Sequence, residues 1–380
     1  MKGMKFLTKR SIEAVIFLII FFGFFGYLGS KMGLPNMMNT IMQTAYSLLL
    51  ETVFYIMAIT VVSGALGNLL VEFGVVRLIE IVLRPLMKPL YNLPGVAALG
   101  GVMTFLSDNP AIISLSKDAH FARYFKKYQL VSLTNFGTAF GMGLVVIMFM
   151  MGKGFLPAAL VGLVGACVGS IVSTRLMQHF ILKSNPELNA DISSEEGDEE
   201  KISFKSEGSV FLRFLNAILD GGKSGVEIGL AIIPGVLIIS TLVMMLTFGP
   251  ATDGSYTGAA YEGVALLPFL ADKIDFVFKW LFGFENSQLV AFPITALGAV
   301  GAALGLIPRF IQEGIVNGNA IAVFTAMGMC WSGYLSTHTA MLDSLGFRSL
   351  TSKAILAHTI GGLIAGIVAH WLYVLLSMIF

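Results

Sequence analysis

A short polar cluster, Ser107, Asp108 and Asn109 followed by Pro110, interrupts an otherwise apolar stretch of the chain. Within a membrane, a carboxylate is costly unless it is paired, hydrated or protonated, so Asp108 is a candidate to bind a solute or a proton. Ser107 and Asn109 would add hydrogen-bonding groups beside it. The alternative is that Asp108 only caps the helix that follows, as Asp, Ser and Asn often do.

A second polar group lies in the apolar stretch 328–342, which reads GMCWSGYLSTHTAML. Hydroxyls and an imidazole gathered in such a stretch favour a lined cavity for a small polar solute over a single histidine satisfied in the core. An unperturbed imidazole also titrates near neutral pH, so the histidine is a second candidate, after Asp108, for carrying protons. The residues concerned are Ser332, Ser336, Thr337, His338 and Thr339.

Thr134 and Asn135 lie beside several glycines in a third apolar stretch. Small residues there allow close helix packing, which is one explanation of the pattern. The other is a broken helix whose free carbonyl groups and side chains face a site. No cluster has the spacing of metal ligands or of a nucleophile and its base. We therefore expect no enzyme, no metal and no cofactor, apart from a coupling ion such as H⁺ or Na⁺.

The composition of the chain indicates that these residues are held by transmembrane helices. The chain has 380 residues, of which 56% are hydrophobic and only 12% charged, and its formal net charge is +1. This is the composition of a membrane protein, and it gives no reason to expect a nucleic-acid partner. We predict an all-α integral membrane protein with about seven transmembrane helices, at residues 11–28, 46–70, 129–151, 155–177, 226–248, 319–342 and 353–378.

The stretch around Asp108 is too short to cross. Eleven helical residues rise ~16 Å, about half of the ~30 Å hydrocarbon core. Pro110 cannot continue the hydrogen-bond ladder of the preceding turn. We therefore predict a re-entrant hairpin at 93–118 and a second at 286–308, interrupted near 298–301. Each follows an amphipathic interfacial helix, at 73–91 and 263–282.

The order of interfacial helix, hairpin, polar span and closing span occurs twice, which predicts inverted repeats. The basic N-terminal flank places the N-terminus in the cytoplasm, and we expect the bacterial inner (plasma) membrane. The predicted divisions are an N-terminal helix and connection (1–45), a first repeat (46–183), an acidic cytoplasmic linker (184–208) and a second repeat (209–380). A short amphipathic run at 210–219 is expected to form an interfacial helix that leads into the span at 226–248. The motif DGGKSG at 220–225 lacks the full phosphate-loop pattern and is dismissed.

Residues 61–135 resemble the gate, or nucleoside-recognition, domain of bacterial spore-maturation proteins A and B. The resemblance rests on GVVRLIEIVLRPLMKPL and LSDNPAII, and on ILDGGKSGVEIGLAIIPGVLIISTLVMML at 218–246. The order of elements is also similar to that of the concentrative nucleoside transporters. There the first hairpin tip carries a glutamate followed by Ala-Pro, and Asp108-Asn109-Pro110 stands in its place. The second acid of those transporters has no counterpart in ALGAVGAALGL of the second hairpin.

The resemblance implies a membrane transporter of a small, nucleoside-like or other polar metabolite, and a homo-oligomer, a trimer by analogy. The expected function is ion-coupled transport by alternating access, with the site between the two hairpins. Its alternative is a non-transporting scaffold of the spore-maturation type.

Overall fold

The computed structural model describes residues 9–192 and 208–379. These residues are nearly all helical and contain no strand, only one isolated bridge between Lys126 and Asp191. Six helices are long and apolar enough to cross a membrane. The prediction of an all-α membrane protein is therefore confirmed. Most of the predicted acidic linker lies outside the described residues.

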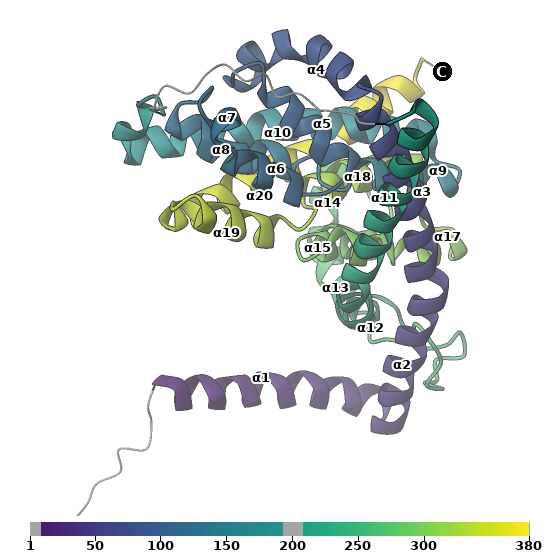
Figure 1. The fold of residues 1–380 in the computed structure, drawn as a ribbon. Coiled ribbons are helices and arrows are strands. Elements are labelled where there is room, and N and C mark those ends of the chain that lie inside the picture. The colour runs from purple at the N-terminus through teal and green to yellow at the C-terminus, as the bar shows by residue number, and fades with distance from the viewer. Residues whose placement is uncertain (1–8, 193–207, 380) are drawn as a thin grey trace, which may run out of the picture.

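The N-terminal helix α1 (Lys9–Met32) projects sideways from the rest of the protein (Figure 1). Only 6% of its apolar window is buried, so its aliphatic and aromatic side chains face outward. The chain then forms one long rod from α2 (Leu34–Ser47) through a π-helical turn (Leu48–Val53) to α3 (Phe54–Glu72). The rod begins earlier than the predicted span at 46–70, because Pro35 lies in the first turn of α2, where proline is tolerated.

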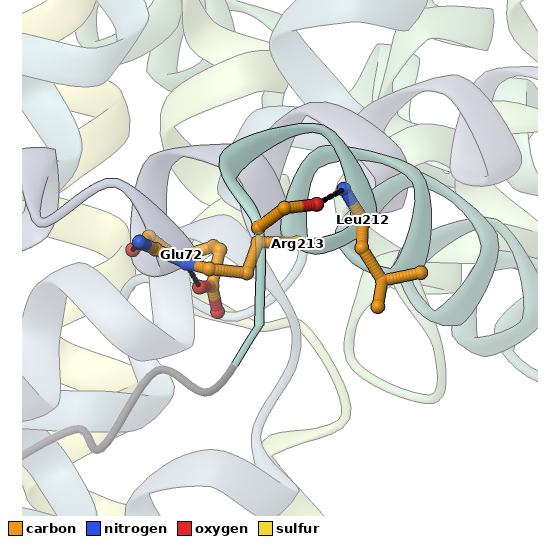
Figure 2. A network of polar contacts seen from close by, with 4 residues as sticks. Glu72, Leu212 and Arg213 are labelled. Carbon is orange, nitrogen blue, oxygen red and sulfur yellow. Dashed lines mark hydrogen bonds and ion pairs between the residues drawn. The ribbon is translucent and has the colours of Figure 1, made fainter.

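Helix α11 (Val210–Ala231) packs along α3. Their backbones approach so closely that a Cβ built on Gly64 would clash with the Gly221 carbonyl, and the reverse also holds. Thr60 Oγ1 donates a 2.7 Å hydrogen bond to the carbonyl of Gly225. At the end of the pair, Arg213 Nε donates to Glu72 Oε1 at 2.7 Å (Figure 2).

The prediction that 210–219 and 226–248 are separate elements is wrong. Residues 220–225 run through the middle of α11, and their glycines are there for close packing against α3. The helix ends near Pro234 and continues as a π-helical turn (Gly235–Ser240) and α12 (Thr241–Thr247).

The first hairpin consists of α5 (Ala97–Leu106) and α6 (Pro110–Lys117), and the chain breaks between them. It follows the amphipathic α4 (Val75–Leu86), as predicted. In the second hairpin, α15 (Ala291–Ala296) and α16 (Val300–Leu304) flank a break at 297–299. The predicted break at 298–301 was close to the observed one. Two short helices, α13 (Leu266–Ala271) and α14 (Asp275–Phe282), precede this hairpin.

A broken span and a long helix follow each hairpin. The first broken span is α8 (Lys127–Thr138) and α9 (Gly143–Gly152), followed by α10 (Leu156–Ser184). The second is α18 (Gly318–Cys330) and α19 (Tyr334–Ser344), followed by α20 (Thr351–Ser377). The six apolar helices include the first broken span, as Lys127–Gly152. The second broken span, predicted as the seventh span at 319–342, is not among them, because α18 and α19 have only 13 and 11 residues.

Backbone geometry repeats with the element order. Residues with positive φ precede α4 and α13 (Gly74, Ala265), follow the interfacial helices (Asn92, Gly283), and precede α9 and α19 (Met142, Gly333). Each pair is 191 residues apart. Since a non-glycine residue with positive φ is uncommon, three such pairs at one separation favour an internal duplication. A position in the first half therefore corresponds to the position 191 residues later in the second half.

Candidate functional site

One cavity of about 610 Å³ is lined by both hairpin tips, both broken spans and α11. The first tip contributes Ser107 to Ala111, and the second contributes Ala299 to Gly301. The breaks contribute Met142 and, from the second half, the segment around Gly333. Elements that are far apart in sequence therefore meet around a space large enough for a small solute.

Asn109 lies where the two broken spans meet. Its side chain is 5% exposed, and its Nδ2 donates a hydrogen bond to the Ser332 carbonyl. A Cβ on Gly141 would lie 2.8 Å from Asn109 Cγ, and one on Gly333 would lie 3.5 Å from Nδ2. Glycine at 141 is thus required for the hairpin tip to enter between the two breaks.

Asp108 and Ser107 line the cavity from the same tip. Ser107 Oγ donates to the Met103 carbonyl at 2.7 Å, whereas Asp108 Oδ1 is buried and accepts no hydrogen bond from a described residue. Asn109 Oδ1 is in the same condition. Buried acceptors normally have partners, so these two oxygen atoms mark a place where a solute, an ion or water completes the structure.

The second predicted group divides into two. Ser332, Ser336 and Thr337 line the cavity. His338 and Thr339 do not: His338 is fully buried, with its ring 4.7 Å from that of His358, and Thr339 Oγ1 donates to the Leu335 carbonyl. The helical turn of α19 therefore directs half of the polar run toward the cavity and half away from it.

Thr134 and Asn135 are also buried outside the cavity lining. Asn135 Nδ2 donates to Ser173 Oγ and to the Ala354 carbonyl, both at 2.9 Å. Ser173 Oγ is in turn 2.8 Å from Nδ1 of His358. The structure therefore places Asn135 in a polar network that joins α8, α10 and α20.

His358 of α20 supports the second break. Its Nε2 forms a hydrogen bond with the carbonyl of Cys330, the last residue of α18. Trp331 Nε1 donates to the His358 carbonyl at 3.4 Å. Carbonyl groups at a helix end have no partner within the helix, so this contact satisfies one of them.

Two lining residues with a hydroxyl or carboxylate side chain, Ser224 and Glu227 of α11, were not predicted. Both are exposed to the cavity side of the α3–α11 pair. Glu227 could have been found in the sequence as an acidic residue close to a long apolar stretch. The sequence does not reveal which side of α11 faces the hairpins.

No family model matches this chain. The "uncharacterized protein BpOF4_10220" of Alkalihalophilus pseudofirmus is 32% identical over 117 residues, which are 30% of this chain and 25% of that protein. This chain thus spans only about a quarter of that relative. The resemblance to the spore-maturation proteins is not confirmed by these comparisons.

The fold is similar to that of CNTnw, a concentrative nucleoside transporter. Its inward-facing, substrate-bound structure matches with a TM-score of 0.53 and 14% identity, over 83% of this chain and 73% of that chain. An outward-facing variant matches with a TM-score of 0.56 and 12% identity, over 95% of this chain and 84% of that chain. The protein is therefore a multi-pass membrane protein with the fold of this transporter class.

Proposed function

We propose that the protein is a secondary active transporter of a small polar solute. The observation that carries the proposal is the single cavity lined by both hairpin tips and both helix breaks. Discontinuous helices that meet within the membrane are how secondary transporters build solute and ion sites, because irregular backbone at that depth must line a cavity or be buried in protein.

The solute would bind between the hairpins, and access would alternate between the two sides of the membrane by an elevator-like movement. The α3–α11 pair is held together by backbone contact at Gly64 and Gly221 and by the Glu72–Arg213 ion pair, so it suits the stationary part. The hairpins and broken spans would move against it. Asn109, which joins the first hairpin to the second break, would keep the moving part together.

Asp108 would bind the solute or the coupling ion, H⁺ or Na⁺. Ser107, Ser332, Ser336 and Thr337 would complete the site with hydroxyl groups. Thr134, Asn135, His338 and Thr339 would act behind the site, by holding the backbone that lines it. In this proposal His338 relays protons only through the network around His358.

The proposal includes the two inverted repeats, a cytoplasmic N-terminus and the bacterial inner membrane. It also includes a homo-oligomer. The repeated element order and the three pairs of positive-φ residues support the repeats, and the outward-facing apolar side chains of α1 support a membrane or subunit contact for that helix.

Uptake into proteoliposomes tests the proposal, with a panel of nucleosides, amino sugars, amines and organic acids as candidate solutes. Asp108→Asn should reduce uptake of the accepted solute at least about tenfold, since it removes the charge at the tip. Asp343→Asn is the matched control. Its carboxylate lies outside the cavity lining, is 61% exposed, and forms a surface ion pair with Arg348 at 3.9 Å. Absence of uptake for every solute, or equal uptake by both variants, would contradict the proposal.

A further inference from the structure

The charged residues that line the cavity are acidic. Among the described lining residues, only Asp108 and Glu227 carry a formal charge, and no lysine, arginine or histidine is included. The two acids come from different elements, the first hairpin tip and α11. A space lined by charge of one sign concentrates solutes of the opposite sign.

Among the described residues, neither carboxylate forms an ion pair. Lys223 lies one turn before Glu227 on α11, but it forms no ion pair with it and does not line the cavity. Asp108 Oδ1 is buried and accepts no hydrogen bond from a described residue. A buried charge without a partner is costly, so a bound cation would relieve that cost.

The remaining groups fit the same reading. The hydroxyl oxygens of Ser336 and Thr337 can accept hydrogen bonds from an N–H donor. The second tip, Ala299 to Gly301, adds no charged side chain. An anionic solute would face two carboxylates without a cationic partner, and a neutral solute would leave the buried Oδ1 of Asp108 uncompensated.

Resting on the transport function proposed above, we infer that the solute is a small organic cation that carries an amine, amidine or guanidine group. Its cationic group lies toward Asp108 and Glu227. The rest of the molecule occupies the remainder of the roughly 610 Å³, against the second hairpin tip. The requirement for both acids distinguishes this inference from a neutral solute whose coupling ion pairs with Asp108 alone.

The first experiment measures the charge preference of the cavity without a known solute. In a chain with Cys167→Ala and Cys330→Ala, Ser336→Cys places a thiol in the lining. Its modification rates by a cationic and an anionic methanethiosulfonate are compared, each relative to 2-mercaptoethanol. The two carboxylates of the same lining should favour the cationic reagent by roughly tenfold or more.

In the double variant Asp108→Asn with Glu227→Gln, the ratio of the cationic to the anionic modification rate should fall to within about twofold of one. Asp343→Asn, an exposed acid outside the lining, should leave it unchanged. A preference at or below one, or a preference that survives neutralisation of both acids, would overturn the inference.

The second experiment measures thermal stabilisation of the purified protein by matched sets of solutes. Glucosamine, N-acetylglucosamine and glucuronate form one set, and agmatine, putrescine and histamine are each paired with a neutral and an anionic counterpart. The largest shifts should come from cations and should be lost in Glu227→Gln. Equal shifts across the three charges, including none at all, would overturn the inference.

Uptake separates this inference from the proposed function. Uptake of a neutral or anionic member in preference to its cationic counterpart would overturn the inference and leave the transporter intact. A cation preference in modification and binding, without uptake of any cation, would overturn transport and leave the charge preference of the cavity standing.

Discussion

The tips of the two hairpins lie at corresponding places in the two halves but carry opposite kinds of side chain. Asp108 and Asn109 of the first tip correspond, 191 residues later, to Ala299 and Val300 of the second. Both tips line the cavity. Only the first, however, presents a charge and an amide to it.

At the helix breaks the relation is reversed. Gly141 and Val146 of the first broken span correspond to Ser332 and Thr337 of the second, and only the second pair lines the cavity. Each half therefore supplies polar groups from the element that is apolar in the other half. The comparison shows that repeated backbone provides the geometry, while the polarity of the site is divided between the halves.

In the contact between α3 and α11, each half of the chain contributes one glycine, and the two glycines can be tested for equal contributions to stability. Gly64→Ala and Gly221→Ala should each destabilise the protein by about 3 kcal/mol, because the added methyl group meets backbone that cannot rotate away. Unfolding of the purified protein in detergent would measure both. Gly23→Ala, on α1 with nothing within 4 Å of the new Cβ, is the control. A large effect at only one of the two glycines would break the equivalence.

The support of the second break by His358 sharpens the difference between the halves, since Cys167 stands at the corresponding position of the first. His358→Phe should destabilise the protein by about 2 kcal/mol, because a fully buried ring loses hydrogen bonds to Ser173 and to the Cys330 carbonyl. His179→Phe, an exposed histidine on α10, is the matched control and should have little effect. The same unfolding assay applies, and equal effects of both variants would remove His358 from this role.

Substitutions at the start of the interfacial helices should change stability least, and in opposite directions in the two halves. Gly74 and Ala265 both have positive φ, 74° and 48°, before α4 and α13. Gly74→Ala should cost about 1 kcal/mol of stability, and Ala265→Gly should gain up to about that amount, because only glycine adopts this region without strain. Nothing lies within 4 Å of a Cβ at Gly74, so the effect is one of backbone alone. Shifts in the same direction would contradict the correspondence.

Much of the fold could be predicted from the sequence because its interruptions have strong local causes. Ser-Asp-Asn-Pro breaks the first hairpin where the pattern indicated, and the charges of α4 recur at helical spacing. The second hairpin was harder to place because Leu297 to Ala299 contains only small or apolar residues. The predicted division between 210–219 and 226–248 fails because tertiary packing against α3 overrides the weak helix propensity of Gly221 and Gly225.

The sequence predicted a polar site within apolar segments, but it identified only some of the residues that line this site. Polar side chains in apolar segments indicated that Asp108, Ser336 and their neighbours were special, yet they do not reveal which side of a helix faces the cavity. His338 and Asn135 are buried behind the lining, whereas Glu227 of α11 is part of it. Such facing depends on the relative placement of distant elements, and a single sequence does not carry it.

The bare tip of the second hairpin has a consequence for selectivity. A molecule that fills the cavity meets hydrogen-bonding groups from the first tip and the second break, and hydrocarbon from Ala299, Val300 and Ile232. Polar groups of a solute that contact this hydrocarbon would lose their water without replacement. Among the cations that fit the cavity, we expect the protein to favour those with an apolar part, such as histamine, over those that carry polar groups all round, such as glucosamine.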